Sequence, residues 1–315
     1  MKPIVIALGG NALIGPGETG TVEGQYKHLK ITASYLAHLI QKGYLLVISH
    51  GNGPQVGNLL IQQDAGSNQV PTLPMDVCVA ATQGQIGFML ELTLQNALRQ
   101  KKIMLETACV ITNTLINPDD SAFKNPTKPI GPFYSKAKIN SFEKSGFSYI
   151  EDSYRGYRRV VASPKPVGIL QLETIKSLIK QNVIVIAGGG GGIPTYEKNG
   201  LLIGVEAVID KDLSTACLAN GIGAKTFVIL TGVEHVYVDF NQPTQKALRE
   251  VGVKEVREYL KAGQFGKGSM APKIEASLQF LKNGGKEVII THPYKIIEAL
   301  EGKTGTSITA YCCND

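Results

Sequence analysis

The chain contains no tryptophan, only five cysteines, and no long uninterrupted apolar segment. The cysteine count is odd and the spacing irregular, with Cys312 and Cys313 adjacent, so we expect a reducing compartment and no disulfide framework. No apolar run reaches the roughly 18 to 20 residues that span a bilayer, and the first run, residues 4–8, is too short for a signal peptide. We therefore expect a cytoplasmic protein with no membrane partner.

Blocks of like charge and several common catalytic motifs are also missing. The 32 basic and 26 acidic residues give a net charge of +6 without a run of five like charges, which argues against nucleic-acid partners. The sequence has no HExxH, CxxC, GxSxG or GxxxxGK[ST] motif, so no dedicated metal site is expected. With only five histidines, a catalytic site would be poor in bases, which favours an acceptor that is already an anion, such as a carboxylate or carbamate.

Short apolar runs alternate with amphipathic segments along the chain. Continuous apolar character is typical of strands that are covered on both faces, as in a parallel sheet. Leu29, Ala33, Leu36 and Ile40 are spaced as one face of a helix between two such runs. The pattern predicts an α/β fold with strands in residues 4–8, 45–48, 108–111, 183–187, 227–230 and 288–290.

One segment, residues 117–163, breaks this alternation. It is rich in proline, lysine, glycine and tyrosine, but it carries enough aromatic residues to fold. We predict a protruding subdomain here, with Val160 and Val161 returning the chain to the sheet. A boundary near Ala224 divides the chain into an N-terminal lobe, residues 1–223, and a C-terminal lobe, residues 224–315.

Three glycine loops directly follow predicted strands: residues 9–12, residues 50–57 and the five glycines 188–192. Glycine lets backbone N–H groups approach an anion, and ligands of open α/β sheets bind at the carboxyl ends of strands. A plain turn at the strand end is the alternative for the first loop. For the third loop a dinucleotide-binding motif is disfavoured, because Pro194 stands where a helix would begin and Asn199-Gly200 predicts a hairpin.

Three lysines occur in settings that suit a phosphate. Lys128 lies in Asn125-Pro126-Thr127-Lys128-Pro129. Lys211 lies between two aspartates, of which Asp212 is expected to begin or cap a helix, and Lys273 follows Pro272 at an expected helix start. A solvated surface cluster is the alternative for such residues. Phosphoryl transfer requires positioned cations and N–H donors rather than covalent chemistry, so lysines and glycine loops together favour a kinase. His50 is either a general base or, more commonly for a histidine at a strand end, a packing residue.

Taken in order, the motifs resemble those of the carbamate kinases, within the amino-acid kinase superfamily. The resemblance runs nearly end to end and is carried by residues 6–12, 49–57, 83–87, 125–132, 158–161, 189–194, 204–212, 229–233, 268–270 and 302–306.

This resemblance implies a three-layer αβα sandwich around a mostly parallel open sheet of roughly eight strands, and a homodimer. It implies reversible phosphoryl transfer between ADP and carbamoyl phosphate, giving ATP and carbamate, in arginine deiminase-type catabolism. Mg²⁺ would be carried on the nucleotide phosphates, consistent with its habit of retaining water ligands.

The resemblance also implies roles for individual residues. Lys211 and Lys273 would neutralise charge, Asp212 would organise these lysines, and Lys128 would reach in from the protruding subdomain as part of a lid. The carbamate and phosphoryl groups would lie against Gly9, Gly10, Asn11, Gly51, Asn52 and Gly53. The nucleotide would lie against Thr231, Gly232, Val233 and Met270.

The chain departs from the family pattern at residues 153–157, which include Tyr154, at residues 263–265, which include Gln264, and at residues 239–241. None of these departures removes an expected catalytic group, but Tyr154 could change how the lid closes. Two alternatives stay open: a related enzyme that phosphorylates another carboxylate, such as acetylglutamate, and a nucleotide-binding regulator without turnover.

Overall fold

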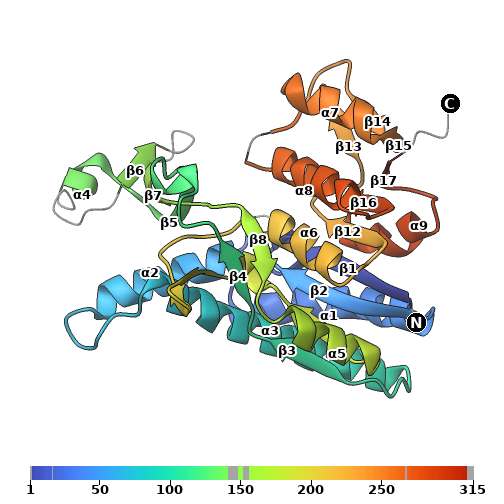
Figure 1. The fold of residues 1–315 in the computed structure, drawn as a ribbon, viewed down its shortest axis with the longest axis horizontal. Helices are drawn as coiled ribbons and strands as arrows, with labels where there is room; N and C mark the ends of the chain where they lie inside the picture. The colour runs from blue at the N-terminus through green and yellow to red at the C-terminus, as the bar shows by residue number, and fades with distance from the viewer. Residues whose placement is uncertain (1, 16, 141–147, 152–155, 267, 311–315) are drawn as a thin grey trace.

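The computed structural model describes residues 2–15, 17–140, 148–151, 156–266 and 268–310 (Figure 1). In this part of the chain the main sheet has eight strands in the order β15-β17-β16-β12-β1-β2-β9-β3. All neighbouring strands are parallel except β16 and β17. All six predicted strands lie in this sheet, whose members are β1 (Lys2–Leu8), β2 (Tyr44–His50), β3 (Thr107–Val110), β9 (Ile184–Ala187), β12 (Thr226–Leu230), β15 (Glu250–Gly252), β16 (Glu287–Thr291) and β17 (Thr306–Thr309).

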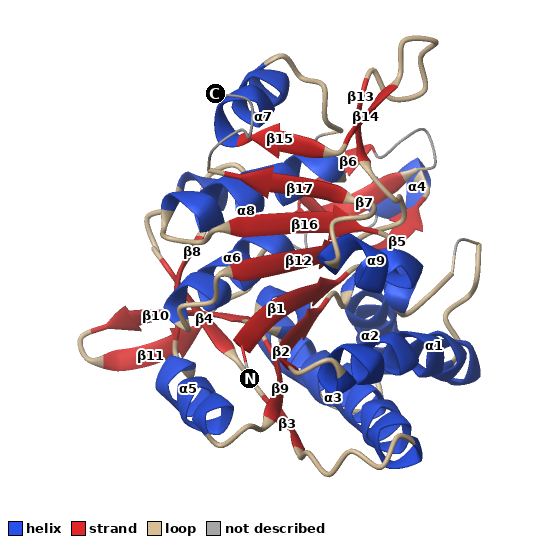
Figure 2. Cartoon of the chain, turned by 90° about the vertical axis from the view of Figure 1, so that its right-hand side faces the viewer, coloured by secondary structure: helices blue, strands red, loops and turns tan. Residues whose placement is uncertain are grey.

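Helices cover both faces of this sheet (Figure 2). Ile4 and Ile6 of β1 pack into one core, whereas Val5 and Ala7 pack into the other, because successive side chains of a strand point to opposite faces. The three-layer sandwich is therefore confirmed. One layer contains α1 (Val22–Gln41), α3 (Met75–Gln100) and α9 (Ile296–Leu300), and the other contains α5 (Leu172–Lys180), α6 (Lys211–Gly221), α7 (Val253–Lys261) and α8 (Met270–Lys282).

Helix α3 is the one helix of the described residues that is long and apolar enough to cross a membrane. Its residues Ile86, Leu90 and Leu94 are buried in the core that the sheet forms with α1. This packing is that of the core helix of a globular protein.

A second sheet of four strands, in the order β11-β10-β4-β8, was not predicted as such. Its strands are β4 (Asn113–Ile116), β8 (Pro166–Ile169), β10 (Ile193–Lys198) and β11 (Leu201–Gly204). The hairpin expected at Asn199-Gly200 is confirmed: it joins β10 to β11, and both turn residues have positive φ, 53° and 77°.

The protruding subdomain is a three-stranded antiparallel sheet of β5 (Lys128–Tyr134), β7 (Tyr157–Val161) and β6 (Ser148–Glu151), with the short helix α4 (Lys136–Asn140). The prediction that Val160 and Val161 rejoin the main sheet is wrong. Both pair with β5 instead, because the return strand closes the subdomain's own sheet before the chain leaves it. Tyr154 lies outside the described residues.

The subdomain rests on α2 (Gly53–Gly66) and stands apart from α8 and the C-terminal strands in Figure 1. Two glycines face each other at this contact, since a Cβ on Gly57 would lie 3.5 Å from the Cα of Gly131. The main sheet takes four strands from residues 1–223 and four from residues 224–315. The lobe boundary at Ala224 itself stays a prediction.

Candidate active site

The three lysines singled out in the sequence meet around two aspartates. Asp212 accepts a hydrogen bond from Lys211 through Oδ1, and its Oδ2 lies 3.1 Å from the Nζ of Lys273. The Nζ of Lys128 lies 3.2 Å from Oδ2 of Asp210. One cluster of charges therefore contains three lysines that are far apart in the sequence: Lys128, Lys211 and Lys273.

Asp212 is ionised even though it is only 3 % exposed. Burial alone would raise the pKa of its carboxyl group. The ammonium groups of Lys211 and Lys273, with their hydrogen bonds, outweigh burial and hold this pKa below the usual range. The site therefore contains a carboxylate that two cations keep charged.

The local fold explains why Asp212 is available to the lysines. The residue that caps α6 is Asp210, whose Oδ1 accepts from the N–H of Asp212 at 2.9 Å and of Leu213 at 3.4 Å. The expectation that Asp212 begins or caps the helix is therefore wrong: the helix begins at Lys211, and Asp212 is its second residue. Because Asp210 satisfies the first N–H groups, the carboxylate of Asp212 is left to bind lysines.

Helix α8, which carries Lys273, also begins earlier than the sequence suggested. Its first residue is Met270, so Pro272 is the third helical residue and not the first. Ser269 is the N-cap but makes no capping hydrogen bond with its side chain; its carbonyl oxygen accepts from Lys273 Nζ at 3.2 Å. Lys273 is thus held between Asp212 and the start of its own helix.

The first two glycine loops lie at neighbouring strand ends. The N–H of Gly9 donates to Leu230 O at 3.1 Å, and the N–H of Gly51 donates to Leu8 O at 3.2 Å. These two N–H groups are already used, and of the two positions only Gly9 lies too close to its neighbour for a side chain. A Cβ on Gly9 would lie 2.5 Å from Leu230 O, and one on Gly51 would lie 3.8 Å from the side chain of Lys211.

Gly10 and Gly53 face open space, because a Cβ at either position would meet nothing within 4 Å. Each is the first residue of a helix, Gly10 in the short 3₁₀ helix Gly10–Ala12, which includes Asn11, and Gly53 in α2. The first N–H groups of a helix have no partner within the helix. Both helix starts are therefore available to an anion.

The five-glycine run packs against the second loop. Four of its residues have positive φ, which explains why glycine suits these positions: Gly188, Gly190, Gly191 and Gly192. A Cβ on Gly190 would lie 2.3 Å from Asn52 Nδ2, and one on Gly189 would lie 2.5 Å from His50 Nε2. The run therefore packs closely against Asn52 and His50.

His50 is a buried structural residue. Its Nδ1 lies 2.9 Å from the carbonyl oxygen of Gly51, which fixes Nδ1 as the protonated nitrogen that donates. Burial, together with the charge of Lys211, lowers its pKa to about 4 even though the hydrogen bond to Gly51 opposes the shift. A group of this pKa is a poor general base at neutral pH, which favours the packing interpretation.

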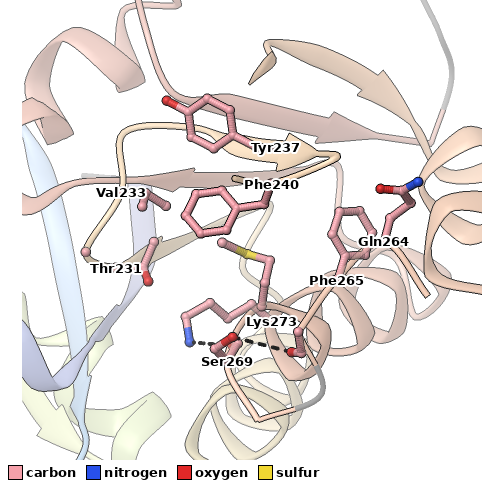
Figure 3. Close-up of a pocket in the computed structure, with 11 residues that line it drawn as sticks. Thr231, Val233, Tyr237, Phe240, Gln264, Phe265, Ser269 and Lys273 are labelled. Carbon is pink, nitrogen blue, oxygen red and sulfur yellow. Dashed lines mark hydrogen bonds between the residues drawn. The ribbon is translucent and has the colours of Figure 1, made fainter. Parts of the chain in front are cut away.

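A cavity of about 330 Å³ includes Lys273 in its lining (Figure 3). It is lined by apolar and aromatic side chains from several elements, including the hairpin of β13 (Val236–Val238) and β14 (Lys246–Leu248). All four expected nucleotide-binding residues line the cavity: Thr231, Gly232, Val233 and Met270. The other lining residues are Tyr237, Phe240, Gln264, Phe265, Gly266, Ser269 and Lys273.

Two departures from the family pattern contact each other beside this cavity. Gln264 Oε1 accepts from the N–H of Asp239 at 2.8 Å, and Gln264 Nε2 donates to Asp239 Oδ1 at 3.0 Å. Asp239 has a φ of 50°, a conformation that most residues avoid. The Gln264 amide therefore holds the loop that carries Phe240.

Sequence reasoning missed several of these residues. Tyr237 lines the cavity and was not singled out, whereas Phe240 and Phe265 lie in the departures at residues 239–241 and 263–265 but were not assigned to the nucleotide. Asp210 was seen only as a neighbour of Lys211, and Thr82, which binds Asn52, gave no signal because it lies within a long helix.

The chain is similar over its whole length to proteins of known family. Residues 2–292 match the model of the amino acid kinase family. The chain is 47 % identical over 309 residues to the carbamate kinase of Pyrococcus horikoshii, covering 97 % of this chain and 98 % of that protein. It is 45 % identical over 307 residues to carbamate kinase 2 of Enterococcus faecalis, with 97 % and 98 % covered.

A solved structure agrees with these matches. The carbamate kinase of Giardia lamblia bound to AMP-PNP superimposes with a TM-score of 0.93 at 39 % identity, covering 98 % of each chain. The chain therefore belongs to the amino acid kinase family and, within it, to the carbamate kinases.

Proposed function

We propose that this protein transfers a phosphoryl group reversibly between carbamoyl phosphate and ADP, giving ATP and carbamate. The observation that carries the proposal is the shared carboxylate of Asp212, which binds Lys211 beside the glycine loops and Lys273 beside the apolar cavity. One cluster of charge thus lies between a site suited to a small anion and a site suited to a nucleotide.

The proposed roles follow from this arrangement. The base and ribose occupy the cavity between Tyr237, Phe240 and Met270, and their phosphates extend toward Lys273. Carbamoyl phosphate lies against the helix starts at Gly10 and Gly53, with Asn11 and Asn52 beside them. The N–H groups of Gly9 and Gly51 are engaged elsewhere.

Lys211 and Lys273 stabilise the charge on the phosphoryl oxygens during transfer, and Asp212 keeps both ammonium groups in place. Lys128 belongs to the subdomain and forms an ion pair with Asp210, so we place it as the cation that closes over the substrate. Carbamate is already an anion, so the reaction requires no general base.

We infer that Mg²⁺ is bound through the nucleotide. In the described residues no group of three or more histidine, cysteine or acidic side chains is arranged to hold a metal, and Asp210 and Asp212 are engaged by lysines and helix N–H groups. This donor set fits Mg²⁺ held by phosphates and water, where it would neutralise the charge of the transferred group.

We also propose a cytoplasmic homodimer that works in arginine deiminase-type catabolism. Exposed apolar side chains on α3, Val77, Phe88 and Leu92, support the dimer. Their spacing places them on one side of the helix, and apolar side chains gathered on a surface mark contact sites.

The proposal is tested by measuring ATP formation from ADP and carbamoyl phosphate with the purified protein. Phosphorylation of carbamate, acetylglutamate and acetate by ATP, measured side by side, distinguishes a carbamate kinase from an enzyme for another carboxylate. ADP binding without ATP formation would instead identify a nucleotide-binding regulator.

Lys211→Ala should lower kcat by roughly 10²-fold or more while the fold persists, because one preorganised charge-stabilising group is lost. Lys176→Ala, which removes a surface lysine paired with Glu173, is the matched control and should leave kcat unchanged. Equal turnover of Lys211→Ala and the wild type would contradict the role of Lys211.

Lys128→Ala should reduce turnover while leaving ADP affinity nearly unchanged, since Lys128 is not among the residues that line the nucleotide cavity. Steady-state kinetics with ADP and carbamoyl phosphate varied separately measures both effects. A selective loss of ADP affinity would count against a lid role for Lys128.

A further inference from the structure

Asn52 occupies the N-cap position of α2 but does not cap the helix. Asparagine is among the preferred N-cap residues because its side-chain oxygen accepts from the N–H of the second or third helical residue. Here the side chain makes no such bond, and the backbone has φ −144° and ψ 8°. The side chain is therefore held in another position.

Thr82 of α3 holds it there. Asn52 Nδ2 donates to Thr82 Oγ1 at 2.9 Å, and the Thr82 hydroxyl donates its single hydrogen to Val79 O at 2.8 Å. Since that hydrogen is used, Thr82 can only accept from Asn52, which determines that Nδ2 of the amide faces α3. Both side chains are buried, so no solvent competes for this bond.

The glycine run confines the amide from another direction. A Cβ on Gly190 would lie 2.3 Å from Nδ2 and 2.4 Å from Cγ of Asn52. The side chain of Asn52 thus lies between α3 and the five-glycine run.

The first turn of α2 has few N–H groups that are free to bind an anion. Its second residue is Pro54, which has no N–H, so a capping Asn52 would take the N–H of Gln55. With Asn52 bound to Thr82, the N–H groups of Gly53 and Gln55 both stay available at the helix start.

We propose that Thr82 is a positioning residue for the anion site: it keeps the Asn52 amide away from the start of α2, so that the N–H groups there bind the anionic group of carbamoyl phosphate. The inference rests on the proposed function, because it assigns this helix start to that substrate. Free N–H groups at a helix start favour an anion through hydrogen bonding and through the helix dipole.

The test replaces the Thr82 hydroxyl with a methyl group of similar size. Thr82→Val should raise the KM for carbamoyl phosphate about 10-fold, because the released amide competes for one N–H, and should change the KM for ADP by less than about 2-fold. Thr82→Ser, which restores the hydroxyl, should restore the KM for carbamoyl phosphate. If Thr82→Val does not fold, Thr82→Ala should show the same effect.

Thr93→Val is the matched control. Thr93 is a buried threonine of the same helix whose hydroxyl bonds only to Met89 O and Leu90 O of that helix, so neither KM should change. Thermal unfolding of each variant measures the cost to stability separately from the kinetic effect.

The outcomes separate this inference from the proposed function. ATP formation by the wild type supports the proposed function whatever the variants do. An unchanged KM for carbamoyl phosphate in Thr82→Val, an equal rise in both KM values, or no rescue by Thr82→Ser would overturn the role of Thr82 alone.

Discussion

At the scale of single residues, the site is governed by buried groups whose charge is set by their neighbours. Asp212 is kept ionised by two lysines, whereas His50, which is distant in the sequence but also feels the charge of Lys211, is kept neutral by burial. Removing one partner of a buried ion pair leaves an uncompensated charge, so the lysines and Asp212 depend on one another for stability as well as for function.

The neutral state of His50 predicts a pH dependence of stability. Its pKa is about 4 in the folded protein and about 6.5 in an unfolded chain. Between these values the unfolded state binds the proton and the folded state does not, so the free energy of unfolding should decrease as the pH falls from about 7 to 4. The loss from this residue should approach about 3 kcal/mol.

Denaturant unfolding of the wild type and His50→Asn across this pH range measures the effect. Asparagine keeps a donor near the position of Nδ1 but does not titrate, so the variant should lose that part of the pH dependence. His38→Asn, at a half-buried histidine of α1, controls for the substitution. Parallel pH profiles of the wild type and His50→Asn would refute the prediction.

The sequence predicted those site residues that lie in recognisable local patterns. Lys211 and Asp212 stood out as part of an Asp-Lys-Asp sequence after an apolar stretch, and Lys273 stood out because it follows Pro272. Thr82 could not be found in this way, since its role comes from a contact with Asn52, 30 positions away in the sequence. Asp210 was overlooked because two aspartates flank Lys211 equally, and only the helix start distinguishes them.

At the scale of elements, the loop between β13 and β14 determines the shape of the nucleotide cavity. Gln264, between α7 and α8, binds both the N–H and the carboxylate of Asp239, next to Phe240. Gln264→Ala should raise the KM for ADP about 10-fold, in line with two lost hydrogen bonds, and leave the KM for carbamoyl phosphate unchanged.

Gln245→Ala is the control for this loop, because Gln245 accepts from the N–H of Asn241 but does not line the cavity. Steady-state kinetics with each substrate varied separately gives both KM values. A rise in the KM for carbamoyl phosphate in Gln264→Ala would show that the loop acts beyond the nucleotide.

Elements with a strong local signal were predicted, and those formed by distant pairing were not. The six strands of the main sheet are short apolar runs that are buried on both faces, which a sequence pattern records directly. The four-stranded sheet joins β4, β8 and β10 from separate parts of the chain, and strand pairing of this kind leaves no local mark. Val160 and Val161 were assigned to the wrong sheet for the same reason.

At the scale of the whole molecule, the proposed dimer makes a prediction about α3. Phe88 is 58 % exposed at the middle of this helix. The start of α3 contacts β11, because Asp76 lies against Gly204. Two further residues of β11, Leu201 and Leu202, are exposed as well. Phe88→Glu should convert the dimer to a monomer, because a charge would be buried in an apolar contact.

Light scattering after size-exclusion chromatography measures the mass of each variant. Met104→Glu is the control: Met104 is 91 % exposed in the loop after α3, and the substitution should leave the mass unchanged. A monomeric wild type, or a Phe88→Glu variant that stays dimeric, would rule out this surface as the dimer contact.

The pairing of three lysines with two aspartates has a consequence for the energy of each catalytic cycle. Gathering like charges in one place is unfavourable, and here Asp210 and Asp212 compensate for that repulsion while the chain folds. In the proposed reaction, an incoming phosphoryl group meets cations that are already assembled, so little reorganisation is left for the moment of transfer. The aspartates thus serve, between turnovers, as built-in substitutes for the negative charge of the substrate.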